Sequence, residues 1–482
     1  MLNLKQSFLR NKERVGVADA EADAEAKAEA SYLSILACPS CQGELSLQGK
    51  KIACLLCGEG YPLVGGIPFL FKDPQLTKAR WHNTLHATCG QLAEEAQLLK
   101  YCLGRGDLLE ATKKRLLHLL QAKKEQIGLL QSLLSPLELK EPLPSTQKLL
   151  ESSIPKASGF VQYYDNIFRD WQWGEEENKA HVNPILSHLP DSFQVDNALV
   201  LGAGAGRLAF DLSLHLAIKR TYAADINPLM LLVAKRMYTN RALSLYEFPI
   251  APLTWKQSAV KHRMKFKGKA PLGLTPILCD ALQPCFKPKS FSFLVTPWFI
   301  DILSCDFKDL VLKLNSLMDM GGHWLNFGSL SFFHADQSLC YSQEEVAEIL
   351  AAGGFSLIKD ARQKLPYLNS PHSSQSRHES VYTFLAVKKE HRSSAAQAAK
   401  EQPSWLTDVS QPIPLLPGFE QALATNTLFC QILAKLDGKS ALRDLAPQVA
   451  LWVGFTEPQA LSLLKQVLGD LWQKQQKAIK FR

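Results

Sequence analysis

Short apolar runs alternate with amphipathic stretches through the central part of this chain. Four of the runs have the length and composition of buried strands: 198–201, 222–224, 276–279 and 291–295. The stretch that begins at about Arg207 instead repeats its apolar residues at helical spacing. Strands that alternate with helices in this way form a parallel sheet covered on both faces. The pattern therefore predicts a Rossmann-like, doubly wound α/β domain over residues 158–390.

The segments outside this domain have other patterns. Residues 1–31 are rich in Ala, Glu and Asp, and such a composition predicts a disordered leader. Leucines at helical spacing predict a helical connector over 76–157 and a small helical domain over 417–482. Residues 391–416 are rich in Ser, Ala, Gln and Pro, which is typical of a linker.

A glycine-rich turn follows the first apolar run. Gly202, Gly204 and Gly206 lie between this run and the helix, and Asp225 ends the next run 19 residues after Gly206. Glycine tolerates positive φ and lets the backbone approach a ligand, while an acid at this spacing accepts hydrogen bonds from ribose hydroxyls. The order of strand, turn, helix, strand and acid predicts a site for a cofactor that contains a nucleoside.

The spacing of the glycines favours S-adenosylmethionine (SAM) over a dinucleotide. A dinucleotide site has the pattern GxGxxG, in which the helix N-terminus faces a pyrophosphate. This chain has GxGxG, with Arg207 and Leu208 where the last glycine is expected. SAM has no phosphate and needs no anion site. Asp280, which ends the third apolar run, is placed to accept a hydrogen bond from the adenine amino group.

Two CxxC pairs in the module over 32–75 predict a structural zinc site. The predicted ligands, in two pairs separated by 12 residues, are Cys38, Cys41, Cys54 and Cys57. Four thiolates form a closed tetrahedral shell, so the ion would be structural rather than catalytic. Four unliganded core cysteines are the alternative. A redox role is less favoured, because a redox dithiol needs only one CxxC.

The cysteine module resembles the small zinc-ribbon proteins similar to the activator subunit of tRNA methyltransferases. LACPSC (36–41) and YPLVGGIP (61–68) carry the resemblance, which covers residues 33–72. In that family the ribbon supports a methyltransferase by protein contact. The resemblance implies that the supported partner is here part of the same chain. A staple for the folding of the N-terminal segment is the alternative.

The composition indicates the class of protein and the cellular compartment that we expect. The chain has 482 residues, of which 46% are hydrophobic and 21% charged, as in ordinary globular proteins of two or three domains. The sequence has no apolar run of about 18 residues, so we expect no membrane partner. Eleven cysteines without a secretory signal indicate thiols and metal ligation, and we expect a cytoplasmic protein. The net charge of +8 is weak support for a nucleic-acid partner.

Three segments of the central domain resemble the carnosine N-methyltransferase family. The first joins FRDW (168–171) and EEEN (175–178) to NPIL (183–186), and the second is GAGAGRLA (202–209). The third contains, in the family's order, FIDI (299–302), GGHWLNFGSL (321–330), His334 and YSQEEV (341–346). The resemblance covers about residues 160–390. It implies the fold of class I SAM-dependent methyltransferases.

The resemblance also implies roles for individual residues. Asp301 matches an acid that orients an imidazole acceptor, and His334 matches a histidine of the substrate pocket. Arg207 belongs to the matched cofactor loop. Arg169 and Trp171 would close over the cofactor, with Arg169 on the SAM carboxylate. An N-cap for the following helix is the alternative for Asp301. Ordinary packing is the alternative for His334, Arg169 and Trp171.

The chain departs from this family before its last strand, where the family places tyrosines that contact the dipeptide. Only Tyr382 is found in residues 375–384, which also contain Arg377 and His378. The acceptor is therefore not fixed as carnosine by the resemblance. A basic residue at this place suits an acidic or larger acceptor.

The sequence thus predicts a SAM-dependent N-methyltransferase that acts on an imidazole-like or amine nitrogen of a small molecule or peptide. Six Lys or Arg residues between Trp255 and Lys269 keep an RNA methyltransferase as one alternative. A SAM-binding interaction protein without activity is another. Residues 436–446 resemble small peptide-binding domains and winged-helix modules. A protein partner through the ribbon or the C-terminal domain therefore stays open.

Overall fold

The chain forms two compact units, Met1–Ser394 and Ala395–Arg482. The computed structural model describes residues 32–49, 51–139, 159–160, 163–266, 268, 270–303, 305–334, 336–392, 428, 430–432, 434–435 and 441–464. The leader predicted over 1–31 lies outside the described residues, as does all but the start of the linker predicted over 391–416.

A sheet of mainly parallel strands forms the centre of the larger unit. The strands are β5 (Gln194–Leu201), β6 (Ala217–Asp225), β9 (Leu274–Cys279), β10 (Phe291–Pro297), β11 (Met318–Gly328), β12 (Phe355–Pro366) and β13 (His378–Lys388). Their order is β9-β6-β5-β10-β11-β13-β12, and β13 runs antiparallel to both of its neighbours. The predicted doubly wound α/β fold is confirmed.

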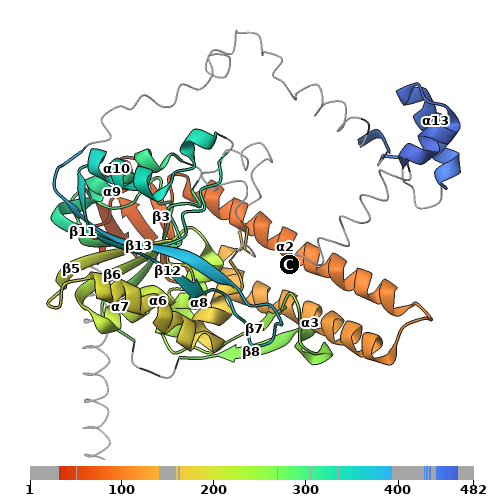
Figure 1. The fold of residues 1–482 in the computed structure, drawn as a ribbon, viewed down its shortest axis with the longest axis horizontal. Helices are drawn as coiled ribbons and strands as arrows, with labels where there is room; N and C mark the ends of the chain where they lie inside the picture. The colour runs from red at the N-terminus through yellow and green to blue at the C-terminus, as the bar shows by residue number, and fades with distance from the viewer. Residues whose placement is uncertain are drawn as a thin grey trace, which may run out of the picture. The chain divides into compact units, whose positions relative to one another are not determined.

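Helices cover both faces of this sheet (Figure 1). The helices α6 (Glu175–His188), α7 (Arg207–His215) and α8 (Pro228–Tyr238) lie on one face, and α9 (Phe307–Leu317) and α10 (Gln343–Ala352) lie on the other. Successive side chains of a strand point to opposite faces. In β5, Leu199 and Leu201 accordingly join the core under α9, whereas Ala198 and Val200 join the core under α7.

The cysteine module extends the same sheet. Its strands are β1 (Leu45–Gln48), β2 (Lys51–Cys54), β3 (Gly60–Val64) and β4 (Ile67–Leu70). They pair antiparallel in sequence order, and β4 then pairs parallel with β9, with Phe69 opposite Leu278 and Leu70 opposite Cys279. The result is a continuous sheet of 11 strands. The module is therefore built into the α/β unit and covers one edge of its sheet.

A long helical hairpin follows the module. It consists of α2 (Pro74–Leu103) and α3 (Glu110–Leu134), with a 3-10 turn, η1 (Ser135–Leu137), after them. Residues 76–139, the described part of the predicted connector, are therefore mainly helical. The hairpin packs on the two-stranded sheet of β7 (Leu243–Glu247) and β8 (Val260–Met264) and on the turn η3 (Trp255–Ser258). The remaining short elements are α5 (Asn166–Phe168), the π-helix η2 (Arg169–Trp173) and η4 (Gln337–Leu339).

A buried hydrogen-bond network joins the hairpin to the segment before η2. Gln126 of α3 donates to the Tyr164 hydroxyl at 2.7 Å and accepts from Tyr246 N at 2.9 Å. The Tyr164 hydroxyl donates in turn to Tyr246 O at 2.9 Å. The hairpin thereby braces the chain that leads into the π-helix.

The smaller unit contains α13 (Leu442–Val453) and a helical stretch over 457–464. Its described core is made by Ile432, Leu445, Val449, Ala460 and Leu464. The predicted helical character is met in these residues.

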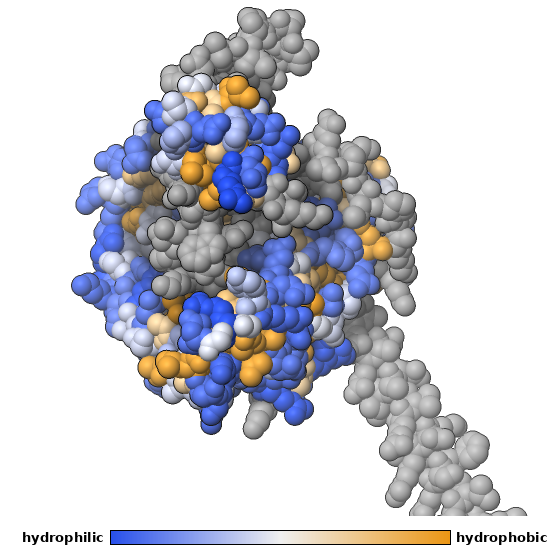
Figure 2. Space-filling view, turned by 90° about the vertical axis from the view of Figure 1, so that its right-hand side faces the viewer, coloured by the Kyte–Doolittle hydropathy of each residue, from blue (hydrophilic) through white to orange (hydrophobic). Residues whose placement is uncertain are grey.

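The surface seen from the tip of the hairpin is mainly hydrophilic, with separate small hydrophobic patches (Figure 2). Tyr101, Leu109 and Leu117 are exposed apolar residues of the hairpin. No helix in the described part of the chain combines the length and hydrophobicity needed to cross a lipid bilayer.

Because β4 lies between β3 and β9 and joins the cysteine module to the common sheet, a cavity there should destabilise the whole larger unit. Phe69 is fully buried, and we expect Phe69→Ala to lower the free energy of unfolding by about 3–5 kcal/mol. Denaturant unfolding followed by circular dichroism measures this. Leu47→Ala, on the exposed side of β1, is the control and should change it by less than about 0.5 kcal/mol. If Phe69→Ala leaves the main unfolding transition unchanged, the cysteine module folds independently of the rest of the sheet.

Candidate active site

The glycine loop connects β5 to α7. Gly202, Gly204 and Gly206 have φ of 69°, 56° and 83°, a region that other residues adopt at a cost. A methyl group at Gly206 would also lie 2.1 Å from the hydroxyl oxygen of Tyr238. That hydroxyl donates a hydrogen bond of 2.7 Å to Gly206 O. The loop therefore requires glycine for its backbone conformation and, at Gly206, also for close approach.

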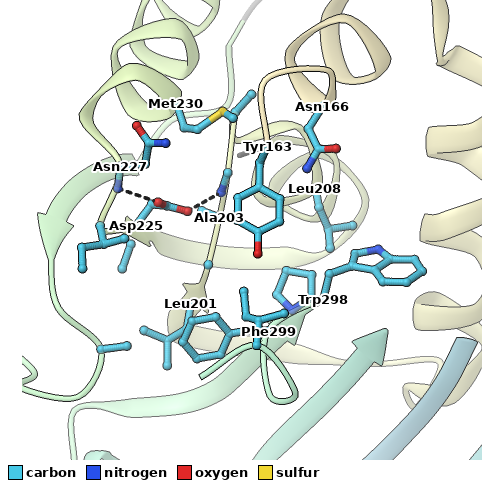
Figure 3. Close-up of a pocket in the computed structure, with 18 of the residues that line it drawn as sticks. Tyr163, Asn166, Leu201, Ala203, Leu208, Asp225, Asn227, Met230, Trp298 and Phe299 are labelled. Carbon is cyan, nitrogen blue, oxygen red and sulfur yellow. Dashed lines mark hydrogen bonds between the residues drawn. The ribbon is translucent and has the colours of Figure 1, made fainter. Parts of the chain in front are cut away.

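Asp225 fastens this loop to the end of β6. Its Oδ2 accepts from Gly204 N at 2.8 Å and its Oδ1 accepts from Asn227 N at 2.8 Å (Figure 3). Burial raises the pKa of this carboxyl, and the backbone N–H donors of Asn227, Gly204 and Ile226 oppose that rise. Each carboxylate oxygen can accept a second hydrogen bond. Asp225 therefore shapes the loop and still offers acceptors to a ligand.

A cavity of about 310 Å³ lies against the carboxyl ends of β5, β6, β9 and β10. Ligands of open α/β sheets bind at this edge. Five of the predicted site residues line the cavity: Arg169, Gly202, Gly204, Asp225 and Asp280. Asp280 is 9% exposed and accepts a hydrogen bond from Leu282 N at 2.8 Å. Burial raises the pKa of its carboxyl.

Aromatic side chains form much of the cavity wall. They are Trp81, Tyr163, Trp298, Phe299, Phe327 and Tyr367 (Figure 3 shows Tyr163, Trp298 and Phe299). The Trp298 and Tyr367 rings lie 4.5 Å apart. Trp298 has a φ of 51°, which is strained for a bulky residue, and its Nε1 is buried without a hydrogen-bond partner. Strained residues cluster at functional sites, which supports a ligand-contacting role for this wall.

Arg169 reaches the cavity from the π-helix η2. Its Nε and Nη2 donate to Asp170 Oδ1 at 2.8 and 2.7 Å, and its side chain is 11% exposed. Its Nη1 is buried without a hydrogen-bond partner. A buried donor left unpaired costs about 1–3 kcal/mol, so Nη1 is the group that an anionic part of a ligand would satisfy.

His181 is a cavity residue that the sequence analysis did not single out. Burial and the positive charge of Arg169 lower the pKa of His181 to about 3, although the hydrogen bond to Pro366 O acts to raise it. The imidazole is therefore neutral near neutral pH. Its Nε2 lies 3.1 Å from Pro366 O, and because a carbonyl only accepts, Nε2 carries the proton. Nδ1 is then left as an acceptor.

Three other residues predicted to bind the cofactor lie behind the loop rather than on the cavity wall. The Arg207 guanidinium donates to Asp211, to Glu175 and to Asp170 O, and lines a neighbouring surface pocket. Trp171 Nε1 donates to Ala205 O at 2.7 Å. Gly206 faces Tyr238. These contacts hold the loop in place and give the three residues a positioning role.

Asp301 is not itself among the described residues that line the cavity, but the next residue, Ile302, is. Its Oδ2 accepts from Ser329 Oγ at 2.6 Å and from Ser331 N at 2.7 Å, and its Oδ1 is buried without a hydrogen-bond partner. The alternative role as a helix N-cap is wrong, because Asp306 caps α9 by accepting from Lys308 N. A buried acceptor without a donor fits a ligand N–H group.

The other predicted substrate residues point elsewhere. His334 is half-buried, its Nδ1 accepts from Asp336 N at 3.0 Å, and it is not among the described residues of the cavity wall. The Tyr382 hydroxyl donates to Asp360 at 2.9 Å. The tyrosine that lines the cavity from this part of the chain is Tyr367, which the sequence analysis missed. Only the fold brings it beside Trp298, so no local motif signals it.

The four predicted zinc ligands come together at one end of the ribbon. Their sulfur atoms all lie within 4.8 Å of one another, with 3.7 Å between Cys38 and Cys57 and 3.5 Å between Cys41 and Cys54. In a tetrahedral site with Zn–S bonds of about 2.3 Å, sulfur atoms are about 3.8 Å apart. The Tyr61 hydroxyl lies 2.9 Å from Cys38 Sγ as an outer contact. The cluster fits a tetrahedral metal ion.

The loop geometry leads to a prediction for two matched glycine variants. Gly206→Ala should lower the free energy of unfolding by more than about 1–2 kcal/mol, because a positive φ and the Tyr238 hydroxyl both oppose a methyl group. At Gly204 an added Cβ meets nothing within 4 Å, so Gly204→Ala should cost only the conformational part. Thermal unfolding of the two variants measures the difference. Equal losses would show that the Tyr238 contact does not restrict this position.

Comparisons with solved structures find methyltransferases. Phosphoethanolamine N-methyltransferase 2 of Haemonchus contortus, in complex with phosphomonomethylethanolamine and S-adenosylhomocysteine, is 17% identical with a TM-score of 0.31. The match covers 49% of this chain and 62% of that enzyme, less than two thirds of its length. The N-methyltransferase NodS of Bradyrhizobium japonicum, in complex with S-adenosylhomocysteine, is 15% identical with a TM-score of 0.32. This match covers 48% of this chain and 98% of NodS.

Comparisons of the sequence identify both parts of the larger unit. A UPF0434 protein of Baumannia cicadellinicola is 45% identical over 42 residues, which are 9% of this chain and 78% of that protein, and this match supports the zinc-ribbon assignment. The model of the carnosine N-methyltransferase family matches residues 147–390. This span is just over half of the chain and contains the whole cavity wall except Trp81. The chain therefore belongs to the carnosine N-methyltransferase family of SAM-dependent methyltransferases.

Proposed function

We propose that the cavity binds SAM and that the protein transfers its methyl group to an imidazole-like or amine nitrogen of a small molecule or peptide. The observation that carries the proposal is the Asp225 carboxylate, held at the end of β6 by two backbone N–H groups and lining the cavity. A ribose diol is the ligand group that two adjacent carboxylate oxygens suit best.

Two other polar side chains of the cavity wall suit the two ends of SAM. Asp280 follows β9, the neighbour of β6, and its carboxylate suits the adenine amino group. Arg169 Nη1, buried and unpartnered, suits the carboxylate of the methionine part. Trp171 and Arg207 support this arrangement indirectly, since their hydrogen bonds fix the glycine loop and η2 to each other.

Asp301 is the acceptor-orienting residue in this proposal. Its unpartnered Oδ1 can accept the N–H of an imidazole, which leaves the lone pair on the other ring nitrogen. His181, held neutral, and the aromatic pair of Trp298 and Tyr367 offer acceptor and apolar contacts in the cavity. His334 stays a sequence-based prediction. Arg377, whose guanidinium lies 4.9 Å from the Tyr367 ring centre, pairs with Glu379 and is not among the described residues of the cavity wall, so a contact with an acidic acceptor stays a sequence-based prediction.

Bound SAM would supply an electrophilic methyl group on a sulfonium. For that methyl group to be transferred, the acceptor nitrogen would have to present an unprotonated lone pair. The chain's part is positioning, which contributes most of the rate in such displacements. Asp301 would fix the tautomer of the acceptor by accepting a hydrogen bond from its N–H group. The buried side chains of the cavity wall would exclude water from the site.

The cysteine cluster suits a structural Zn²⁺, held by Cys38, Cys41, Cys54 and Cys57. A four-thiolate shell has no open position for substrate. The pairing of β4 with β9 supports the in-cis role of the ribbon over a separate partner, because the edge of β4 that a second chain would use is taken.

The alternative of an RNA methyltransferase is less favoured by the geometry. In the described part of the basic stretch, Lys261 forms an ion pair with Glu125 of α3, and His262 is buried against Glu247. Steep salt dependence of RNA binding would be the signature of that alternative.

Replacing Asp225 tests the cofactor assignment. We expect Asp225→Ala to weaken SAM binding by about 1–3 kcal/mol, because the ribose loses its acceptors and Gly204 N loses its partner. Isothermal titration calorimetry with SAM, and with NAD as the unrelated nucleotide, measures this. Asp196→Ala, at an exposed ion pair with Lys219, is the matched control and should bind SAM as the wild type does. If Asp225→Ala binds SAM with the affinity of the wild type, Asp225 does not bind the ribose of SAM.

Replacing Asp301 tests the acceptor site separately. Asp301→Asn keeps the size of the side chain but loses the carboxylate, so we expect kcat to fall by about 10²-fold or more with SAM affinity unchanged. The assay uses the acceptor found by a screen that begins with imidazole dipeptides. Asp306→Asn, at the N-cap of α9, is the control and should keep its kcat. Wild-type turnover by Asp301→Asn would assign Asp301 to structure alone.

A further inference from the structure

A second cluster of metal-binding side chains lies outside the active site. It consists of Glu247 at the end of β7, His262 on β8 and His372 between β12 and β13. One ligand atom from each of the three lies within 4.8 Å of the other two. Glu247 is 2% exposed and His262 is 5% exposed, while His372 is half-buried. Three segments far apart in the sequence thus place one carboxylate and two imidazoles together.

The register of the β7–β8 pair explains how two of these side chains meet. Glu247 pairs with Val260 and Leu245 pairs with His262, so Glu247 and His262 lie diagonally on one face. Leu245 and Met264 of the same face are fully buried. The face therefore turns inward, and Glu247 Oε2 lies 2.7 Å from His262 Nε2.

Outer contacts orient all three side chains. Trp173 Nε1 donates to Glu247 Oε2 at 3.3 Å, and the Ser370 hydroxyl donates to Glu247 Oε1. The His262 ring packs on Phe168 with 4.9 Å between ring centres. Gln257 Nε2 lies 3.4 Å from Nδ1 of His372. Such outer hydrogen bonds are a regular feature of metal sites, where they fix ligand orientation.

We propose that Glu247, His262 and His372 form a second metal site, distinct from the cysteine cluster, that takes Zn²⁺ or a similar divalent transition-metal ion. Two imidazoles and one carboxylate are a ligand set that zinc uses, with a fourth position for water. On binding, the metal replaces the proton between His262 Nε2 and Glu247 Oε2, and this proton passes to solvent.

The site would fasten the segment between β12 and β13 to the β7–β8 pair. This segment also contains Tyr367 of the cavity wall, five residues before His372. The backbone of this segment already has several attachments to the body of the domain, since Leu368 N donates to Glu177 at 2.9 Å and Leu253 N donates to His372 O at 3.2 Å. The ion would add an attachment through the side chain of His372. The inference is independent of the methyl acceptor, because it concerns metal content.

Counting metal in the full-length protein tests the proposal. After incubation with zinc and removal of the excess, plasma mass spectrometry should find two zinc ions per chain in the wild type and one in His372→Gln. His378→Gln is the matched control, because His378 is exposed and close in sequence, and it should retain two. His372 is half-buried, so its replacement should leave the fold intact, which the thermal midpoint of the metal-depleted proteins checks.

Cobalt substitution separates the two sites. Co²⁺ bound by thiolates gives intense charge-transfer absorption, whereas Co²⁺ bound by imidazole and carboxylate gives only weak visible bands. His372→Gln should lose the weak bands and keep the intense ones, and Cys41→Ser should do the reverse. Trp173→Phe removes an outer hydrogen bond and should weaken the second ion about 10- to 100-fold.

One zinc ion per chain in the wild type would overturn the proposal, as would two in His372→Gln. Either result would identify the cluster as a hydrogen-bonded contact between Glu247 and His262 without metal. Wild-type cobalt spectra in His372→Gln would have the same meaning.

Discussion

The carboxylate of Asp225 is the interaction on which the active site depends. It accepts one hydrogen bond from the glycine loop and one from the start of α8, so the ends of two parallel strands keep a fixed relation. Burying this charge is costly, and the backbone donors that reduce the cost are the ones that shape the loop. The same atoms therefore define the loop and the wall on which a ribose would lie. Around this centre, the rest of the structure holds the walls of the cavity in place.

Much of that support comes from parts of the chain outside the α/β core. Gln126 of the hairpin and Tyr164 connect α3 to β7, directly ahead of the π-helix that carries Arg169 and Trp171. A π-helix is a rare, strained element that needs such bracing. The helical connector, which has no chemical motif of its own, thus acts on the active site through the placement of η2.

The parts of the site that are contiguous in sequence could be predicted, and those assembled by the fold could not. The glycine loop begins directly after β5, Asp225 is the last residue of β6 and Asp280 directly follows β9, so the end of an apolar run locates each of them. His181, Trp298 and Tyr367 come from three distant elements and look like ordinary core or loop residues in the sequence. For Arg207, in contrast, the position next to the loop in the sequence suggests a contact with the cofactor that the fold does not provide. Asp211, one helical turn later, draws the Arg207 side chain away from the cavity.

The pairing of β4 with β9 has a consequence for how this protein exists in solution. In a complex of two separate chains, the occupancy of such a contact depends on the concentrations of both. Here both strands belong to one polypeptide, so the contact is intramolecular and its formation does not depend on the amount of protein present. The ribbon is therefore present in a fixed ratio of one to one with the α/β domain of the same chain. An unpaired β9 edge, a ready template for aggregation, is also never presented by the folded chain.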